Sequence, residues 1–226
     1  MALFEPAAQK LEAAEDVTFG QLLELAGALA ATGGRKILGI TGAPGVGKSM
    51  LAERLASELA PGMAVCVPMD GFHLSNEILL ARGIRDRKGA IDTFDDGGYA
   101  ALLHRLRRQQ DGDGTIFAPV FRRTVEESIG SALPVEADVP LVITEGNYLL
   151  QDTGAWPLAR QAMDRTWYLG ADNELRRERL LRRHMSFGKS DEEAQAWTSG
   201  SDEENARLIA ASAFRADRRF RLSETA

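Results

Sequence analysis

The sequence predicts an α/β fold, with a parallel five-stranded sheet flanked by helices. Short apolar segments alternate along the chain with segments whose apolar residues recur at helical spacing. This alternation is typical of parallel strands that are covered on both faces. One apolar segment also runs directly into a glycine-rich turn and then into a helix, which puts the turn at the edge of the sheet where ligands gather.

Each expected strand is a short apolar segment. The five strands are residues 36–41, 63–69, 140–144, 165–169 and 218–222. Helical spacing, with Thr18 as a cap for the first helix, predicts the segments around them. The expected helices are 18–31, 48–60, 75–81, 99–109, 155–163, 172–184, 191–197 and 202–216. The rest of 74–98 is expected to be loop.

Composition limits the classes of protein to consider. The chain has 226 residues, 44% of them hydrophobic and 27% charged, which suits one globular domain over residues 1–226 with a helical extension at 1–34. A net charge of −6 argues against a general nucleic-acid partner. No apolar run of about 18 residues occurs, so we expect no membrane partner.

The only cysteine, Cys66, excludes an internal disulfide and a cysteine metal cage. A chain without a disulfide fits a reducing compartment. The first 16 residues contain acids and no long apolar core, which is unlike a signal peptide. We therefore expect a cytoplasmic protein.

Residues 42–49, GAPGVGKS, match the pattern G-x-x-x-x-G-K-[ST] in full. Glycines at these positions let successive backbone N–H groups point at phosphate oxygens, and the following helix begins at the same place. Lysine at this position reaches the terminal phosphates, and the serine hydroxyl ligates Mg²⁺. The expected nucleotide-binding residues are Gly42, Ala43, Pro44, Gly45, Val46, Gly47, Lys48, Ser49 and Met50.

Three classes of phosphate-loop protein compete. A guanine-nucleotide switch should carry an Asn-Lys-x-Asp motif, which is absent from the sequence. A motor or transport ATPase usually has a second carboxylate beside the acid that ends a strand, whereas Glu145 stands alone. A small-molecule kinase needs a carboxylate near the γ-phosphate, and Asp70 follows an expected strand. Spacing alone leaves open whether Asp70 is catalytic or forms a turn before Gly71.

Three stretches resemble the phosphoribulokinase/uridine kinase group of P-loop kinases. They are residues 39–49, 69–95 (MDGFHLSNEILLARGIRDRKGAIDTFD) and 142–150 (VITEGNYLL). The middle stretch is especially similar to pantothenate kinases and to uridine-kinase-like proteins labelled fructose transport system kinases. The resemblance runs in order from about residue 36 to 217. It implies a P-loop NTPase fold, ATP, Mg²⁺ and phosphoryl transfer to a hydroxyl of a small metabolite.

The resemblance also implies roles for particular residues. Asp70 corresponds to the catalytic base, Lys48 acts on the phosphates, and Glu145 with Ser49 lies at the metal. An Arg-rich lid of about residues 172–200 is expected to close over ATP, with Arg179 as its catalytic arginine. The lid arginines expected to touch phosphate are Arg176, Arg179 and Arg183.

The expected substrate contacts are Asp70, His73, Arg87, Lys88, Arg123 and Tyr148. Four of them have a structural alternative: packing for His73 and Tyr148, and loop solvation for Arg87 and Lys88. The chain departs from its sugar-kinase-like relatives at Arg122, where they tend to have an acid. Because of this departure, the contacts that residues 119–123 (PVFRR) make with the acceptor need not match those of the relatives, and of these residues only Arg123 is expected to contact it.

The predicted function is an ATP-dependent small-molecule kinase. The acceptor stays open among nucleosides, pantothenate-like compounds and sugars, and a homodimer is left open as well. The alternative is a nucleotide-binding regulatory protein with little transferase activity. The DGFH, RKG and TFD motifs argue against that alternative, because a switch has no need of an acceptor pocket.

Overall fold

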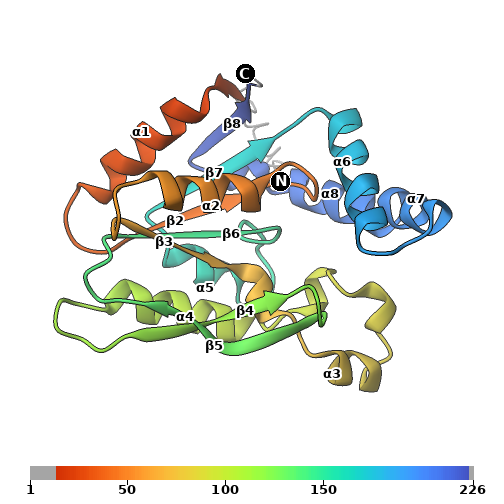
Figure 1. Cartoon of the computed structure of the whole chain (residues 1–226), viewed down its shortest axis with the longest axis horizontal. Helices are drawn as coiled ribbons and strands as arrows, with labels where there is room; N and C mark the ends of the chain where they lie inside the picture. The colour runs from red at the N-terminus through yellow and green to blue at the C-terminus, as the bar shows by residue number, and fades with distance from the viewer. Residues whose placement is uncertain (1–13, 224–226) are drawn as a thin grey trace, which may run out of the picture.

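The computed structural model describes residues 14–223 and has a six-stranded parallel sheet at its centre (Figure 1). The strand order is β1-β8-β7-β2-β6-β3. The strands are β1 (Glu15–Val17), β2 (Lys36–Thr41), β3 (Ala64–Pro68), β6 (Leu141–Gly146), β7 (Arg165–Gly170) and β8 (Arg218–Leu222). All neighbouring strands pair in parallel, as the alternation of strands and helices predicts.

Helices cover both faces of the sheet and form a core on each. On one face lie α1 (Phe19–Ala30) and α2 (Lys48–Glu58), which pack on Leu38 and Ile143. On the other lie α4 (Asp96–Arg108) and α5 (Trp156–Gln161), which pack on Ile37 and Val142. Successive residues of a strand point to opposite faces, so one apolar run supplies both cores.

The remaining helices gather at the edge of the sheet where the strands end. Figure 1 shows α6 (Asn173–Ser186) and α7 (Asp191–Ser199) on the same side of the sheet as α3 (Asn76–Ala81). The helix α8 (Ser201–Ala211) follows α7 directly. Among the described residues, no helix is long and apolar enough to cross a membrane.

The strand count differs from the prediction of five. The sixth strand, β1, lies within the expected helical extension; its three residues pair with β8 at the far end of the sequence. Residues 1–13 of that extension lie outside the described part of the chain. A second, two-stranded sheet consists of β4 (Ile116–Arg122) and β5 (Glu127–Val135). Its pairing is interrupted between Ala118 and Val120, which weakens the alternation that marks a strand.

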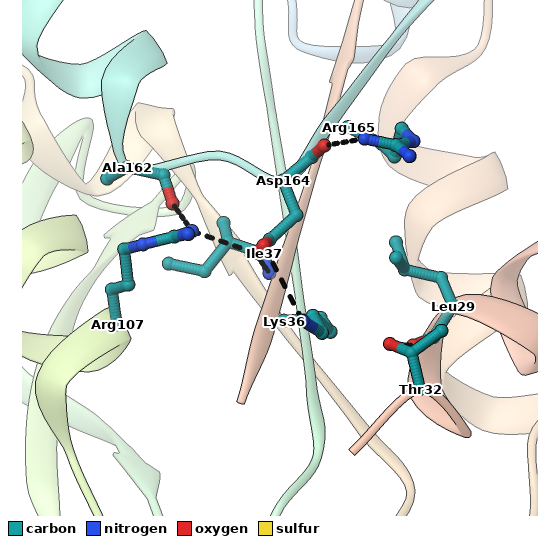
Figure 2. Close-up of polar contacts among 8 residues, drawn as sticks. All are labelled: Leu29, Thr32, Lys36, Ile37, Arg107, Ala162, Asp164 and Arg165. Carbon is teal, nitrogen blue, oxygen red and sulfur yellow. Dashed lines mark hydrogen bonds and ion pairs between the residues drawn. The ribbon is translucent and has the colours of Figure 1, made fainter. Parts of the chain in front are cut away.

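The carboxylate of Asp164 joins the amino ends of the central strands (Figure 2). One of its oxygens accepts from the backbone N–H of Ile37 at 2.9 Å and from Arg107 of α4 at 2.9 Å. The other lies 3.9 Å from Nζ of Lys36. Arg107 also donates to the carbonyl of Ala162 at 2.8 Å. These contacts hold the start of β2 between β7 and α4, at the end of the sheet away from the phosphate loop.

Candidate active site

The loop after β2 has the backbone shape of a phosphate cradle. Gly42, Gly45 and Gly47 have φ values of +156°, +84° and +97°, a region that side chains rarely adopt. Gly47 is also the residue immediately before α2, and no side chain caps that helix. The free N–H groups at the start of α2 are therefore available to an anion.

Close packing of α6 explains why glycine stands at position 45. A Cβ placed there would lie 2.7 Å from the carbonyl oxygen of Arg176 and 2.8 Å from Cγ of Leu180. Arg176 is itself buried; it donates to Glu203 at 2.6 Å and reaches the carbonyl of Pro44 at 3.5 Å. The described contacts of Arg176 therefore brace the outside of the cradle.

Lys48, Ser49 and Glu145 form a polar cluster at the mouth of the cradle. Ser49 Oγ donates to Oε1 of Glu145 at 3.0 Å, and Nζ of Lys48 donates to the carbonyl of Ala43 at 3.2 Å. Burial lowers the pKa of Lys48, against the attraction of Glu145 and Asp70. Burial also raises the pKa of Glu145, with help from the charge of Asp70 and against Lys48 and the Ser49 hydrogen bond. A cation and an acid are thus both held in a site shielded from water.

Asp70 reaches the same place from β3. It lies in the 3₁₀ helix Met69–Phe72, which follows the last residue of β3 directly. The β4–β5 hairpin packs against this turn: a Cβ on Gly71 would lie 2.4 Å from the carbonyl oxygen of Pro119. That approach brings Arg123 to 3.5 Å from Asp70 Oδ2, in a half-exposed ion pair.

These groups line one cavity of about 360 Å³. Of the predicted site residues, it is lined by Pro44, Lys48, Ser49, Asp70, His73, Lys88, Arg123, Glu145 and Arg183. They come from the cradle and α2, from the segment between β3 and α4, from the β4–β5 hairpin, from β6 and from α6, so residues far apart in the sequence meet here. Burial and the charge of Arg123 lower the pKa of Arg183, against the attraction of Asp202, Asp70 and Glu145.

His73 stands in the cavity wall as a packed ring. Its Nδ1 donates to the carbonyl of Asp70 at 2.8 Å. The ring lies between those of Phe94 and Phe121, with centroids 4.1 and 4.6 Å away. Burial lowers the pKa of His73, so the neutral form is favoured near neutral pH. Because Nδ1 carries the proton that it donates to the Asp70 carbonyl, Nε2 of the neutral ring is a hydrogen-bond acceptor.

Two expected substrate contacts lie elsewhere in the described part of the chain. Arg87 points out of the cavity and pairs with Asp92 at 2.9 Å. Tyr148 is buried in the core, where its hydroxyl donates to the carbonyl of Gly89 at 2.6 Å. Tyr148 thus holds the backbone of a residue that does line the cavity.

The other predicted nucleotide contacts lie around the cradle, outside the described lining of the cavity. They are Gly42, Ala43, Gly45, Val46, Gly47, Met50, Arg176 and Arg179. Arg179 lies close to the loop, with one guanidinium nitrogen 4.0 Å from the position of a Cβ on Gly47. Met50 is 61% exposed on α2.

Sequence reasoning missed several residues of the cavity wall. Two of them, His184 and Asp202, face each other at 2.7 Å between α6 and α8. Arg85, Asn147, Phe187, Lys189 and Trp197 also line the cavity. No spacing pattern marks them, because they meet only when three separate helices and the β3–α4 connection pack together.

The donor set fits a hard divalent cation that is shared with phosphates. Among the described residues no group of three or more His, Cys, Asp or Glu side chains could hold a metal. Ser49 and Glu145 nevertheless offer two oxygens that are 3.0 Å apart. Mg²⁺ is usually held by one or two such groups plus substrate phosphates and water.

Known proteins share both the sequence and the fold. A family model described as an AAA domain matches residues 38–198. The protein YggC of Escherichia coli is 35% identical over 179 residues, which cover 77% of this chain and 73% of YggC. A candidate uridine kinase of Schizosaccharomyces pombe is 32% identical over 185 residues, 74% of this chain and 75% of that protein.

A solved structure gives the same result. A candidate fructose transport system kinase from a Silicibacter species is 36% identical, with a TM-score of 0.80 over 90% of this chain and 99% of that one. The resemblance to P-loop kinases inferred from the motifs is therefore confirmed. With a family match over most of its length, the chain belongs to the AAA domain family of P-loop proteins.

Proposed function

We propose that this protein is an ATP-dependent small-molecule kinase that transfers the γ-phosphoryl group to a hydroxyl of a metabolite. The observation that carries the proposal is the shared cavity. Lys48 and Ser49 from the cradle, Glu145 from β6 and Asp70 from β3 all line it. A protein that only senses nucleotide also needs an acid such as Glu145 at the metal, but it needs neither a second carboxylate such as Asp70 nor an enclosed space beyond the phosphates.

The cradle and Lys48 would hold the triphosphate tail and stabilise the charge that spreads over the γ-phosphoryl oxygens. Ser49 and Glu145 would hold Mg²⁺, which supplies charge neutralisation between the phosphates. The half-buried carboxylate of Asp70 would orient the acceptor hydroxyl and take its proton as the oxygen–phosphorus bond forms. The bond from the γ-phosphorus to the bridging oxygen breaks, and ADP leaves.

Residues 172–200, which contain α6 and α7, would act as a lid that closes over the bound ATP. Arg183 already lines the cavity, and it is the lid arginine best placed to touch phosphate. Arg179, whose guanidinium lies close to Gly47, and Arg176 stay predicted phosphate contacts. Closure would exclude water, which otherwise competes with the alcohol as acceptor.

The test is a coupled ADP-release screen over nucleosides, sugars and vitamins, with the phosphorylated product identified by mass spectrometry. Lys48→Ala is the control, since loss of the cradle lysine should abolish the signal if it belongs to this protein. ATP as donor, Mg²⁺, a cytoplasmic location and a homodimer stay predictions beside it.

The regulatory alternative makes the opposite prediction. ADP release that stays flat across a wide panel, with tight nucleotide binding, would favour a nucleotide-binding protein with little transferase activity. The phosphate cradle by itself fits this regulatory function as well as a kinase, because the same loop occurs in proteins of many functions.

A further inference from the structure

The cavity is basic although the chain is acidic overall. The protein has a net charge of −6, yet six Lys or Arg residues line the cavity against four acids. The cations are Lys48, Arg85, Lys88, Arg123, Arg183 and Lys189. The acids are Asp70, Glu126, Glu145 and Asp202. Phosphates of a nucleotide account for the cations near the cradle, but not for those that come from the segment after α3.

The carboxylates near the cradle already have partners. Glu145 accepts from Ser49, Asp70 pairs with Arg123, and Asp202 faces His184. They therefore leave the cations of the segment after α3 uncompensated. In Figure 1, α3 lies well apart from α6, which packs on the cradle, so this segment reaches the cavity from another side.

Arg85 and Lys88 form a basic end of the cavity. Among the described residues, neither has a carboxylate within ion-pair distance. Lys88 instead donates to the side-chain oxygen of Asn76 at 2.8 Å and to the carbonyl of Glu126. Its Nζ lies 5.0 Å from the centre of the Phe121 ring.

The acids nearest to Lys88 do not neutralise it. Burial lowers the pKa of Lys88, and this effect outweighs the attraction of Glu127 and Glu126, while Arg85 repels it further. Oε1 of Glu127 accepts from the backbone N–H of Asn76 at 2.9 Å, and Glu127 forms no ion pair with Lys88. Glu126 is exposed at the turn of the hairpin. Among the described residues, neither cation is therefore balanced by an ion pair.

We infer that the alcohol substrate carries an anionic group, a carboxylate or a phosphate, which Arg85 and Lys88 hold while its hydroxyl faces Asp70. The inference rests on the proposed kinase function and narrows its substrate class. A charged acceptor would make charge-assisted hydrogen bonds to both cations. A neutral acceptor would leave both cations without a counterion once the site closes over it. This selects pantothenate-like and phosphorylated acceptors over plain nucleosides and sugars.

The experiment compares alcohols in matched pairs that differ in one charged group. Glycerate is paired with glycerol, pantothenate with pantothenol, and the fructose phosphates with fructose. We expect at least one anionic member to exceed its neutral twin by about 10- to 100-fold in kcat/KM. The first two pairs test a carboxylate and the third tests a phosphate.

Variants locate the effect. Arg85→Met and Lys88→Met should each raise KM for the anionic acceptor by about 10-fold or more, with kcat and the KM for ATP nearly unchanged. Arg87→Met is the matched control, because Arg87 lies between them in the sequence but pairs with Asp92 outside the cavity. If Lys88→Met does not fold, Arg85→Met carries the test alone.

Calorimetry of the same pairs, on the protein saturated with a non-hydrolysable ATP analogue, separates this inference from the proposed function. Anionic alcohols that bind without transfer would contradict the kinase and keep the inference. Transfer to neutral alcohols in preference to their anionic twins would keep the kinase and overturn the inference. Equal binding of both members of every pair, or an effect of Arg87→Met as large as that of Arg85→Met, would overturn it as well.

Discussion

Ser49 donates its hydroxyl proton to Oε1 of Glu145 at 3.0 Å, across 96 positions of sequence. Ser49 is the last residue of the cradle motif and the second residue of α2, whereas Glu145 is the penultimate residue of β6. Because β2 and β6 are neighbours in the parallel sheet, the start of α2 and the end of β6 meet at one edge. The site therefore has two side-chain oxygens beside Lys48. Because the pKa of Glu145 is raised, the charge on one of them changes with pH.

Glu145→Gln should weaken Mg²⁺ binding and change how the reaction rate depends on pH. Burial and the charge of Asp70 raise the pKa of Glu145. On acidification, its carboxylate is therefore protonated at a higher pH than that of an ordinary Glu. We expect the wild-type rate to fall as the pH drops through this raised pKa, since metal ligation needs the charged form. The Gln variant should lose about 10- to 100-fold in activity, with a raised Mg²⁺ requirement. A Mg²⁺ titration at several pH values measures both.

The same substitution has an opposite effect on stability. A raised pKa means that the folded protein binds this proton more tightly than the unfolded chain does. The contribution of Glu145 to the free energy of unfolding therefore falls as pH rises from the ordinary Glu value of 4.5 through the raised value. The Gln variant, measured by urea unfolding without nucleotide, should gain stability relative to wild type between pH 5 and pH 8. A difference that shrinks with rising pH would contradict the assigned direction of the shift.

Asp70→Asn should separate binding from turnover. The amide keeps the size of the side chain but cannot take a proton, and a well-placed general base typically contributes about 10²- to 10⁴-fold in rate. We expect a loss of that order in kcat with the affinity for ATP retained. Asp92→Asn is the control, because Asp92 lies in the same β3–α4 connection but does not line the cavity. Near-wild-type turnover of Asp70→Asn would remove Asp70 from the role of base.

Much of the fold was predictable because parallel strands and amphipathic helices leave strong local patterns. The strand 36–41 was expected with its observed ends, and the helix after the cradle was expected at its observed start. The strand at 15–17 was not expected, since three residues carry no periodicity and pairing with β8 is decided by tertiary structure. The helix 96–108 begins earlier than predicted because Asp95 caps it through the N–H of Gly98.

The site was predictable where function requires a spacing, and less so where packing decides. The cradle and Asp70 follow strands directly, so their place at the edge of the sheet could be inferred from sequence. Which residue of the segment 85–88 faces the cavity depends on a short 3₁₀ helix, which turns Arg87 outward and Arg85 inward. The His184–Asp202 pair depends on the packing of α6 against α8, which a single sequence does not encode locally.

Gly45→Ala should disrupt the cradle more than its backbone angle alone requires. Gly62 is the matched control, because its φ of +80° is close to the +84° of Gly45, but a Cβ there would meet nothing within 4 Å. Both substitutions incur the cost of a left-handed residue, about 1–2 kcal/mol. Only Gly45→Ala also pushes against Arg176 and Leu180. We expect a larger loss of stability and a raised KM for ATP in Gly45→Ala alone; equal effects in both variants would contradict the packing argument.

Asp164→Ala should lower stability and leave catalysis intact, the reverse of the result expected for Asp70→Asn. The substitution removes the acceptor for the N–H of Ile37 and the partner of Arg107, at the end of the sheet opposite the site (Figure 2). Leaving a buried donor without a partner costs about 1–3 kcal/mol. In a domain of this size each kcal/mol lowers Tm by about 2–4 °C.

Asp164→Asn should cause a smaller loss of stability than Asp164→Ala. Its side-chain oxygen still accepts from Ile37, while the charge that attracts Arg107 and Lys36 is gone. We expect its Tm to lie between that of the wild type and that of Asp164→Ala. The rate per folded molecule, measured well below Tm, should match the wild type for both variants. A lower kcat with an unchanged Tm would mean that the amino end of β2 communicates with the cradle, and the separation of a structural end from a chemical end would fail.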